Sequence, residues 1–424
     1  MAAVGAAAAA PSLEPAGMTI AQIAPAITVP AASAQTPVAV RPPIGLVLSG
    51  GGARGAAQVG VLTVRRVLQL QSCGYNTMMR LSVLDQSPII SGHTPAQAIA
   101  ETVALAQAAE SFGYSRYWLA EHHSTQALAD PCPEILVGRV AAATSTLRVG
   151  TGGVLLPYYS ALKVAEQFRM LEALFPGRID LGVGRAPGSD QRTAMAVGNG
   201  RYPSAEAFPQ QVVDLVGFLD RTLPADHIYG QVTAQPAGDS SPELWLLGSS
   251  DYSGALAAYL GLRFSFAHFI SAHGGEAVMR DYRSQYRPSP REPRPQALLT
   301  VFAVCADTDA EADRLAGAID LRRLRMEQGI NLPVPSQAEV DSYRYSNAER
   351  AVVTRNRART LIGSPQNLRA QMLQLADEFC ADELMILTIT GDYATRRRSY
   401  QLIAEAFELK APARPVSAQA QLAA

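Results

Sequence analysis

The feature that most constrains this chain is a regular alternation of short apolar segments with longer helical patterns, running from residue 80 to residue 407. Such an alternation is typical of a parallel sheet covered by helices. We predict eight strands, at residues 80–84, 116–120, 147–155, 179–184, 243–247, 263–267, 298–303 and 383–388.

The segments between and after these strands have helical periodicity. We predict helices at residues 95–112, 133–143, 161–175, 205–219, 253–260, 276–286, 310–327, 365–379 and 395–407. Eight successive β/α units favour an α/β fold of the closed (β/α)8 TIM barrel type. A doubly wound open sheet is the competing architecture, but no G-x-G-x-x-G fingerprint follows an early strand.

Composition narrows the class of partner. The 424 residues are 48% hydrophobic and 17% charged, which suits a buried core, and the net charge is −1. Because like charges do not gather in blocks, we predict a small-molecule substrate and neither a nucleic-acid nor a membrane partner. The four cysteines are widely spaced, and no apolar run reaches the roughly 18 residues of a membrane span. We therefore expect a cytoplasmic protein.

The chain outside the alternation is predicted to be without function. Residues 1–43 are rich in Ala and Pro and are expected to be disordered. An apolar run then leads into G-G-G-A-R-G at residues 50–55, which resembles the start of patatin-like phospholipases. No G-x-S-x-G nucleophile elbow follows, so hydrolysis is not expected. We predict a truncated patatin-like extension over residues 1–77, a barrel over 78–410 and a disordered tail over 411–424.

Polar residues follow several predicted strands. They are Asp85-Gln86-Ser87, Glu121-His122-His123, Arg185 and Gly248-Ser249-Ser250. Active sites of (β/α)8 barrels lie at these carboxyl ends. The Glu-His-His run does not predict a metal site, because neighbours on an extended strand point to opposite faces. His268, near the end of the sixth strand, either faces the same cavity or is a core histidine.

Five ordered segments together resemble the luciferase-like flavin-dependent monooxygenases over about residues 79–409. They are L-S-V-L-D-Q-S-P, R-Y-W-L-A-E-H-H, R-V-G-T-G-G-V-L-L-P, K-V-A-E-Q-F-R-M-L-E-A-L-F-P-G-R-I-D-L-G-V-G-R-A-P-G and L-L-G-S-S. The resemblance implies a barrel that binds reduced FMN. It also implies reaction with dioxygen to a flavin C4a-hydroperoxide and transfer of one oxygen atom to a small organic substrate.

The resemblance also assigns roles to residues. His122 matches the family's active-site histidine, and a neutral imidazole of near-neutral pKa would help to move protons. Gly152 and Gly153 match a segment that packs against the isoalloxazine, often with a non-prolyl cis peptide. Arg185, with Gly248, Ser249 and Ser250 before a helix, matches the FMN phosphate site. Ser87 and His268 are predicted to contact substrate.

Each of these positions also has a purely structural interpretation: a strand-end hydrogen bond, a strand bulge, a solvated arginine or a serine N-cap. The family further implies a separate NAD(P)H-dependent flavin reductase and a homodimer. Two other functions stay open, a deazaflavin-dependent oxidoreductase and a non-catalytic flavin-binding protein. The polar segment at residues 328–360 is predicted to be a mobile lid that excludes water.

Overall fold

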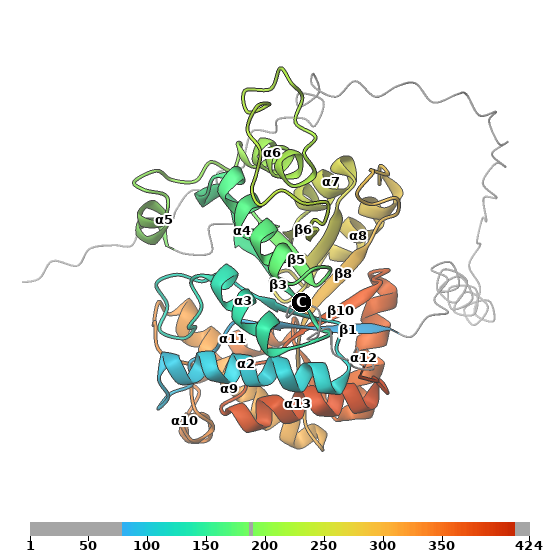
Figure 1. Ribbon diagram of the computed structural model, residues 1–424. Coiled ribbons are helices and arrows are strands. Elements are labelled where there is room, and N and C mark those ends of the chain that lie inside the picture. Colours follow the sequence, from blue (N-terminus) through green and yellow to red (C-terminus); the bar gives the residue numbers. More distant parts are fainter. Residues whose placement is uncertain (1–78, 186–189, 412–424) are drawn as a thin grey trace, which may run out of the picture. The chain divides into compact units, whose positions relative to one another are not determined.

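The computed structural model describes residues 79–185 and 190–411, and within them eight parallel strands close into a barrel (Figure 1). The barrel strands are β1 (Arg80–Asp85), β2 (Arg116–Leu119), β3 (Arg148–Thr151), β5 (Ile179–Gly184), β6 (Glu243–Gly248), β7 (Arg263–Ala267), β8 (Ala297–Cys305) and β10 (Glu383–Leu387). The ring closes because β10 pairs in parallel with both β1 and β8. The predicted (β/α)8 fold is confirmed.

Two short strands extend this barrel. The third predicted strand is interrupted at Gly152–Gly153, so β3 is followed by a separate β4 (Val154–Leu155) that pairs with β5. Strand β9 (Leu361–Gly363) pairs with the end of β8. The sequence pattern missed both details, because a two-residue break or strand leaves little periodicity to detect.

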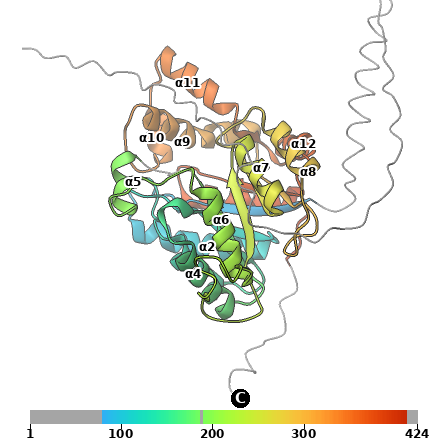
Figure 2. The same ribbon diagram turned by 90° about the horizontal axis from the view of Figure 1, so that it is seen from above.

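Helices surround the strands, as the turned view shows (Figure 2). They are α2 (Pro95–Phe112), α3 (Pro133–Ala143), α4 (Ala161–Leu174), α5 (Gln191–Val197), α6 (Phe208–Asp220), α7 (Asp251–Leu260), α8 (Gly275–Ser284), α9 (Asp309–Glu327), α10 (Gln337–Ser342), α11 (Asn347–Arg357), α12 (Pro365–Glu378) and α13 (Tyr393–Ala406), with a 3-10 turn η4 (Leu156–Tyr158). All nine predicted helices are present. The predicted extension at residues 1–77 and the tail from residue 412 lie outside the described residues.

Local sequence sets where the helices begin and end. At α2 the side chain of Thr94 accepts a hydrogen bond from the N–H of Gln97, and the Gln97 side chain accepts one from Thr94, which forms a capping box. Gly113 then ends the helix with φ of 92°, a conformation that glycine adopts readily. Thr308 caps α9 by accepting a hydrogen bond from the N–H of Glu311.

Strand alternation separates two buried layers. Side chains such as Leu81 and Val83 of β1 point outward and pack against the helices, whereas Leu84 lies with Trp118 and Trp245 inside the barrel. The two indole rings meet edge to face, with centroids 5.3 Å apart. Large aromatic side chains therefore fill the middle of the barrel.

A network of ion pairs fills the N-terminal end of the barrel. The buried guanidinium of Arg116 contacts Asp180 at 2.7 Å, Glu243 at 2.7 Å and Glu383 at 3.1 Å. Arg148 also pairs with Asp180, at 2.6 Å. Buried charges are tolerated only when they are paired and hydrogen-bonded, as these are. This end is therefore closed by side chains, and space for a ligand lies at the carboxyl ends of the strands.

The segment at residues 328–360 was expected to be a lid. It contains α10 and α11, which pack on α9, as Figure 2 shows. Its first part is attached to the loops after β1 and β2: the Val334 N–H donates to Ile89 O at 2.8 Å, and Asn331 accepts from the N–H of Gln126 at 2.9 Å. The segment thus borders the carboxyl end of the barrel, and its predicted mobility stays a prediction.

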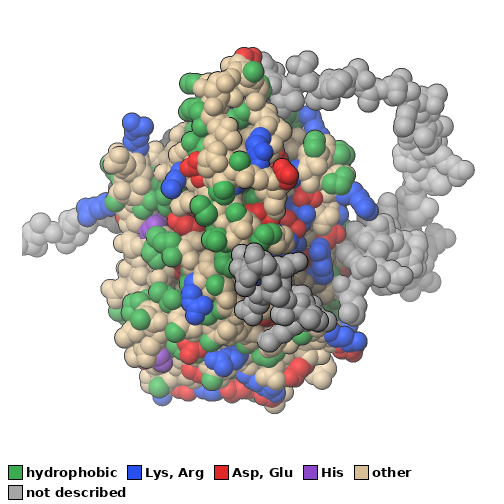
Figure 3. Space-filling model, viewed as in Figure 1, with side chains coloured by type: hydrophobic (Ala, Val, Ile, Leu, Met, Phe, Trp, Pro, Cys, Tyr) green, Lys and Arg blue, Asp and Glu red, His purple; other side chains and the backbone are tan. Residues whose placement is uncertain are grey.

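The outer surface has mixed charge. On the face shown in Figure 3, basic and acidic side chains are interspersed among polar and apolar ones. Among the described helices, none is long and apolar enough to cross a membrane. Within residues 79–185 and 190–411, no group of three His, Cys, Asp or Glu side chains is placed to hold a metal ion.

Candidate functional site

A bare stretch of backbone lies above the tryptophans at the carboxyl end of the barrel. The Gly152–Gly153 peptide bond is cis, as the family resemblance implied. A Cβ atom on Gly152 would lie 2.7 Å from Leu84 and 3.2 Å from Trp118, and one on Gly153 would lie 2.6 Å from the Gly182 carbonyl oxygen. Because neither position has room for a side chain, only glycine fits this closely packed stretch of backbone.

His122 lies at the end of β2. Its Nδ1 is 3.3 Å from the Ala120 carbonyl oxygen, and its backbone N–H donates to Asp130 O at 3.0 Å. The pKa of His122 is lowered to about 4, mainly by desolvation; the Ala120 hydrogen bond opposes this shift, and the positive charge of Arg322 contributes to it. The imidazole is therefore neutral at physiological pH, as expected, but its pKa lies well below the near-neutral value that we expected.

The neighbours of His122 have structural partners. Buried Glu121 accepts hydrogen bonds from the Leu155 N–H at 2.8 Å, the Tyr159 hydroxyl at 2.6 Å and His123 Nε2 at 2.7 Å. These bonds connect the end of β2 to β4 and η4. Glu121 and His123 therefore hold the backbone on either side of His122 in place.

Asp130 is a buried carboxyl group that the sequence pattern did not single out. Its Oδ1 accepts the Cys132 N–H at 3.0 Å, while its buried Oδ2 has no hydrogen-bond partner among the described residues. Burial raises the pKa of Asp130 to about 7, and the nearby carboxylates of Asp85, Glu134 and Glu121 contribute. The carboxyl group that retains its proton to neutral pH thus belongs to the residue whose backbone carbonyl accepts the His122 N–H.

Arg322 was also missed, because it lies on α9, far from His122 in the sequence. Desolvation lowers the pKa of its guanidinium to about 10, and its buried Nε has no partner among the described residues. An unpaired cation in a partly dehydrated position is costly, so it is often retained for a function. Only the fold reveals that this charge acts on His122.

Arg185 and the start of α7 lie together. Arg185 follows β5, and its guanidinium carbon is 4.5 Å from the ring centroid of Tyr252, in the first turn of α7. Ser250 is the N-cap of that helix but forms no side-chain capping bond. Ser249 and Ser250 hydroxyls form no hydrogen bond with the described part of the chain, and a Cβ on Gly248 would lie 2.3 Å from Ser253.

Ser87 and His268, predicted to contact substrate, are directed toward the helices. The buried Ser87 hydroxyl accepts a hydrogen bond from Thr102 of α2 at 3.0 Å. His268 continues the outward-facing row of Phe264 and Phe266, and its ring packs edge to face on Phe379 with centroids 5.6 Å apart. The structure therefore does not bring either residue to the barrel interior, since Ser87 bonds with α2 and His268 packs on Phe379.

Directly after β1, Gln86 is the polar residue whose side chain faces the barrel interior. It lies between Asp85 and Ser87, whose side chains both point outward, toward Arg396 and Thr102. Gln86 is therefore on the side of Leu84, and 8% of its surface is exposed. The period-two pattern of β1 could have identified it in place of Ser87.

The carboxyl end of the barrel, called the barrel mouth below, therefore combines four features. They are a closely packed glycine backbone, a neutral histidine beside a buried cation, a carboxyl that holds its proton to about pH 7, and an arginine beside the free hydroxyls of a helix N-terminus. The last pair suits a phosphate group, since helix N-termini and guanidinium groups both bind anions.

Most of this chain is similar in sequence to known proteins. The family model described as luciferase-like monooxygenase matches residues 79–382. The uncharacterized protein YceB of Bacillus subtilis is 44% identical over 330 residues, which cover 78% of this chain and 100% of YceB. The N-acetyl-S-alkylcysteine monooxygenase of Bacillus subtilis is 35% identical over 332 residues, 78% of this chain and 98% of that enzyme.

Solved structures have the same fold. The crystal structure of apo-MsnO8 aligns with a TM-score of 0.72 and 40% identity, covering 78% of this chain and 99% of that one. More distant matches show the fold alone. They include the FMN complex of the oxygenating constituent of 3,6-diketocamphane monooxygenase from Pseudomonas putida, with a TM-score of 0.57 and 18% identity over 78% and 97% of the two chains. An F420-dependent secondary alcohol dehydrogenase aligns with a TM-score of 0.56 and 13% identity over 78% and 99%.

Proposed function

This chain belongs to the luciferase-like monooxygenase family of oxygen-incorporating oxidoreductases, and from that premise we propose that it uses reduced FMN and dioxygen to oxygenate a small organic substrate. The observation that supports a phosphate-bearing flavin is the placement of Arg185 over Tyr252, in the helix that Ser249 and Ser250 precede. A phosphate-bearing cofactor would satisfy a guanidinium and two hydroxyls that have no hydrogen-bonding partner in the described part of the chain.

The residues present fit a flavin. Gly152 and Gly153 let the backbone at the end of β3 pack closely on Leu84, Trp118 and Gly182, and we propose that a planar isoalloxazine lies against this stretch of backbone. Gly248 keeps the loop before α7 close to the helix. Reduced FMN held there would supply two electrons, so that dioxygen gives one oxygen atom to the substrate and the other leaves as water. Arg185, Ser249 and Ser250 would hold its phosphate.

The chain's own contribution lies around His122. With a pKa of about 4, the imidazole is neutral, so it accepts or donates a hydrogen bond without bringing a charge to the mouth. Burial is the main cause of this neutrality and the Arg322 cation contributes to it; the same cation favours any negative charge that develops nearby. Asp130, with a pKa of about 7, is a proton source near His122 at neutral pH.

Water must be excluded while oxygen is activated, since leakage to bulk solvent releases hydrogen peroxide instead of product. The ion pairs around Arg116 close one end of the barrel, and residues 331–334 are bonded to loops at the other. We propose that this segment limits access of solvent to the mouth.

Partners follow from the same proposal. The chain has no recognisable nicotinamide-binding motif, so a separate NAD(P)H-dependent reductase in the cytoplasm would supply reduced FMN.

A homodimer is proposed through α3 and α4, which pack on each other and expose Ile135, Met170 and Leu174 at 73%, 52% and 61%. The 35% identical relative makes N-acetyl-S-alkylcysteines the first substrates to assay.

The decisive experiment is an anaerobic titration of the full chain with reduced FMN, followed by mixing with oxygenated buffer and a substrate panel. We expect saturable binding, and one oxygen atom from labelled dioxygen in the product. A parallel titration uses a reduced deazaflavin. Binding of the deazaflavin and not of reduced FMN would overturn the proposal in favour of hydride transfer, whereas FMN binding without oxygen transfer to any substrate would indicate a flavin-binding protein.

A further inference from the structure

The register of the sheet places Gln86 beside the strand end that carries His122. Leu84 of β1 is the register partner of Trp118 of β2, and both side chains face the barrel interior. The next inward positions are Gln86 and Ala120, because side chains on one face of a strand recur with a period of two. His122 follows two residues after Ala120, and its Nδ1 lies 3.3 Å from the Ala120 carbonyl oxygen. Gln86 and His122 are therefore neighbours at the barrel mouth.

The side-chain amide of Gln86 has no partner within residues 79–185 and 190–411. Only 8% of the surface of Gln86 is exposed, and its Oε1 and Nε2 form no hydrogen bond with the residues in these ranges. Neither atom belongs to the unpaired polar atoms that the protein seals from solvent, as it does the indole nitrogen of Trp245. The amide therefore reaches accessible space, where it offers a ligand both a donor and an acceptor.

Arg322 brings a positive charge to the same place from α9. Its Nε is sealed and unpaired, whereas its two terminal nitrogens keep accessible surface. No carboxylate in the described part of the chain pairs with it, although Arg314 of the same helix contacts Glu311 at 2.8 Å and Asp341 at 2.9 Å. The charge is near enough to contribute to the lowered pKa of His122, which locates it at the end of β2. A cation that is largely removed from water and has no counter-charge favours an anionic ligand.

The imidazole and two apolar side chains complete this set. Nε2 of His122 has no hydrogen-bond partner among the described residues and is not sealed. Leu247 at the end of β6 and Phe269 after β7 are partly exposed and pack on the same interior cluster as Leu84. Three unpaired polar groups thus meet accessible space beside an apolar wall, an arrangement that is typical of a small-molecule site.

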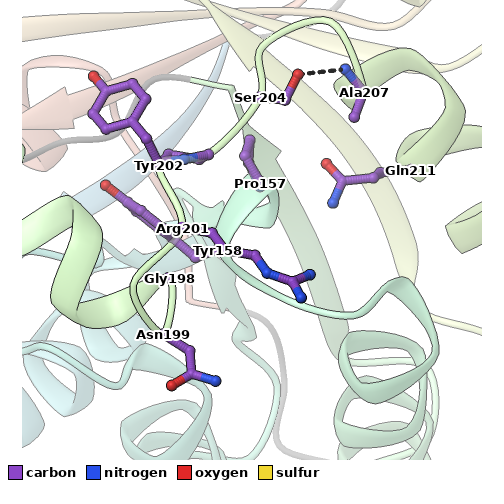
Figure 4. A pocket seen from close by; sticks show the side chains of 10 residues that line it. Pro157, Tyr158, Gly198, Asn199, Arg201, Tyr202, Ser204, Ala207 and Gln211 are labelled. Atoms are coloured by element: carbon purple, nitrogen blue, oxygen red, sulfur yellow. Dashed lines mark hydrogen bonds between the residues drawn. The ribbon is translucent and has the colours of Figure 1, made fainter.

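A second arginine shows the contrast. A hollow of about 460 Å³ lies beside η4, and Figure 4 shows Arg201 among the side chains that line it. Arg201 and Tyr202, which both line the hollow, are exposed, so water already solvates that guanidinium. An anion gains little from a solvated surface charge, whereas Arg322 is largely desolvated. Of the two arginines, Arg322 is therefore the better partner for an anion.

We propose that Gln86 and Arg322 bind an oxyanion group of the organic substrate at the barrel mouth. Arg322 pairs with the negative charge, and the Gln86 amide donates an N–H to the same group. The apolar body of the substrate lies against Leu247 and Phe269. This inference rests on the proposed function and deepens it, because it assigns the substrate to the apolar carboxylates.

The test is histidine NMR of the full chain at neutral pH, with benzoate as the anionic probe and benzyl alcohol as its neutral counterpart. Benzoate should shift the His122 imidazole signals saturably. Arg322→Met should weaken benzoate binding about tenfold or more and leave benzyl alcohol unchanged, because a poorly solvated ion pair is lost. Gln86→Met, which keeps the length of the side chain but not its amide, should weaken benzoate binding about threefold or more.

Two further variants serve as controls. Arg314→Met removes a cation of α9 that carboxylates already neutralise, so it should leave benzoate binding unchanged. Arg322→Lys keeps the charge and should retain more of the binding than Arg322→Met. Equal weakening in Arg314→Met and Arg322→Met would overturn the proposal, as would the absence of a saturable His122 shift at about 10 mM benzoate.

The other source of a negative charge at the barrel mouth is the cofactor. The benzoate titration is therefore repeated anaerobically with saturating reduced FMN. Binding of both together supports a substrate site, whereas displacement of benzoate by reduced FMN would assign Gln86 and Arg322 to the flavin and overturn the proposal. The titrations without flavin depend on the anion site alone, so failure of the flavin assignment is detected separately, by the reduced FMN titration of the wild type.

Discussion

The guanidinium carbon of Arg185 lies 4.5 Å from the ring centroid of Tyr252, which links the end of β5 to the first turn of α7. The contact orients the Arg185 cation at the start of α7, the helix that Ser249 and Ser250 precede. A cation that an aromatic ring already orients at a helix N-terminus binds an anion with a smaller loss of conformational entropy.

Arg185→Gln should weaken binding of reduced FMN about tenfold or more, because the charge-assisted hydrogen bonds to phosphate are lost. Binding of reduced riboflavin, which has no phosphate, should be unchanged. Anaerobic fluorescence titration measures both constants, and Arg350→Gln on the exposed face of α11 serves as control. Equal effects on the two flavins would place the phosphate elsewhere.

His122→Ala should lower the yield of oxygenated product by roughly a hundredfold and raise hydrogen peroxide release, as expected when a positioned proton-transfer group is removed. Since the pKa of His122 is about 4, kcat/KM of the wild type should show no inflection from this residue between roughly pH 5.5 and 8. An inflection near pH 6.5 that disappears in His122→Ala would contradict the lowered pKa.

Arg322→Met should raise the pKa of His122, because it removes the neighbouring positive charge that disfavours the imidazolium. Imidazole NMR of labelled protein follows the titration directly. Arg325→Met is the control, since Arg325 is on the same helix and pairs with Glu339 at 3.7 Å. An unchanged His122 titration in Arg322→Met would show that desolvation alone sets its pKa.

Asp130→Asn should make stability less dependent on pH. The folded pKa of about 7 lies above the ordinary 3.8, so the folded state holds a proton that the unfolded state releases between these values. The contribution of Asp130 to the free energy of unfolding is therefore fully present below pH 3.8 and is lost as pH rises through 7. Relative to wild type, the variant's Tm should rise by roughly 2 °C or more from pH 5 to pH 8. A constant Tm difference would mean that Asp130 is ionised in the folded protein.

Gly153→Ala should destabilise the fold more than Gly152→Ala. The new methyl group on residue 153 would meet the backbone oxygen of Gly182 at 2.6 Å, whereas on residue 152 the nearest atoms belong to the side chains of Leu84 and Trp118. Side chains adjust more easily than a barrel strand, so we expect about 1–3 kcal/mol for Gly153→Ala and less for Gly152→Ala. Urea denaturation would compare the two variants. The reverse order would show that β5 yields to the new methyl group more easily than the Leu84 and Trp118 side chains do.

The sequence predicted the bounds of an element correctly where the residues that define them lie within or next to that element. Strand β5 and helix α2 have the predicted bounds, because alternation and the cap residues Thr94 and Gly113 lie within or next to the elements that they define. It was less reliable at strand ends. Ser87 was predicted to contact substrate, yet its hydroxyl bonds with Thr102 of α2, away from the barrel interior, and Gln86 takes the inward position.

By itself the sequence determined the eight β/α units, the carboxyl ends at which polar residues gather, and the glycine pair at 152–153. Only the tertiary structure decided which of those residues lie together at the barrel mouth and which charged groups shift their pKa values. The reason is that burial and Coulomb interaction depend on atoms from distant segments: Arg322 of α9 acts on His122 of β2, and carboxylates from three segments act on Asp130.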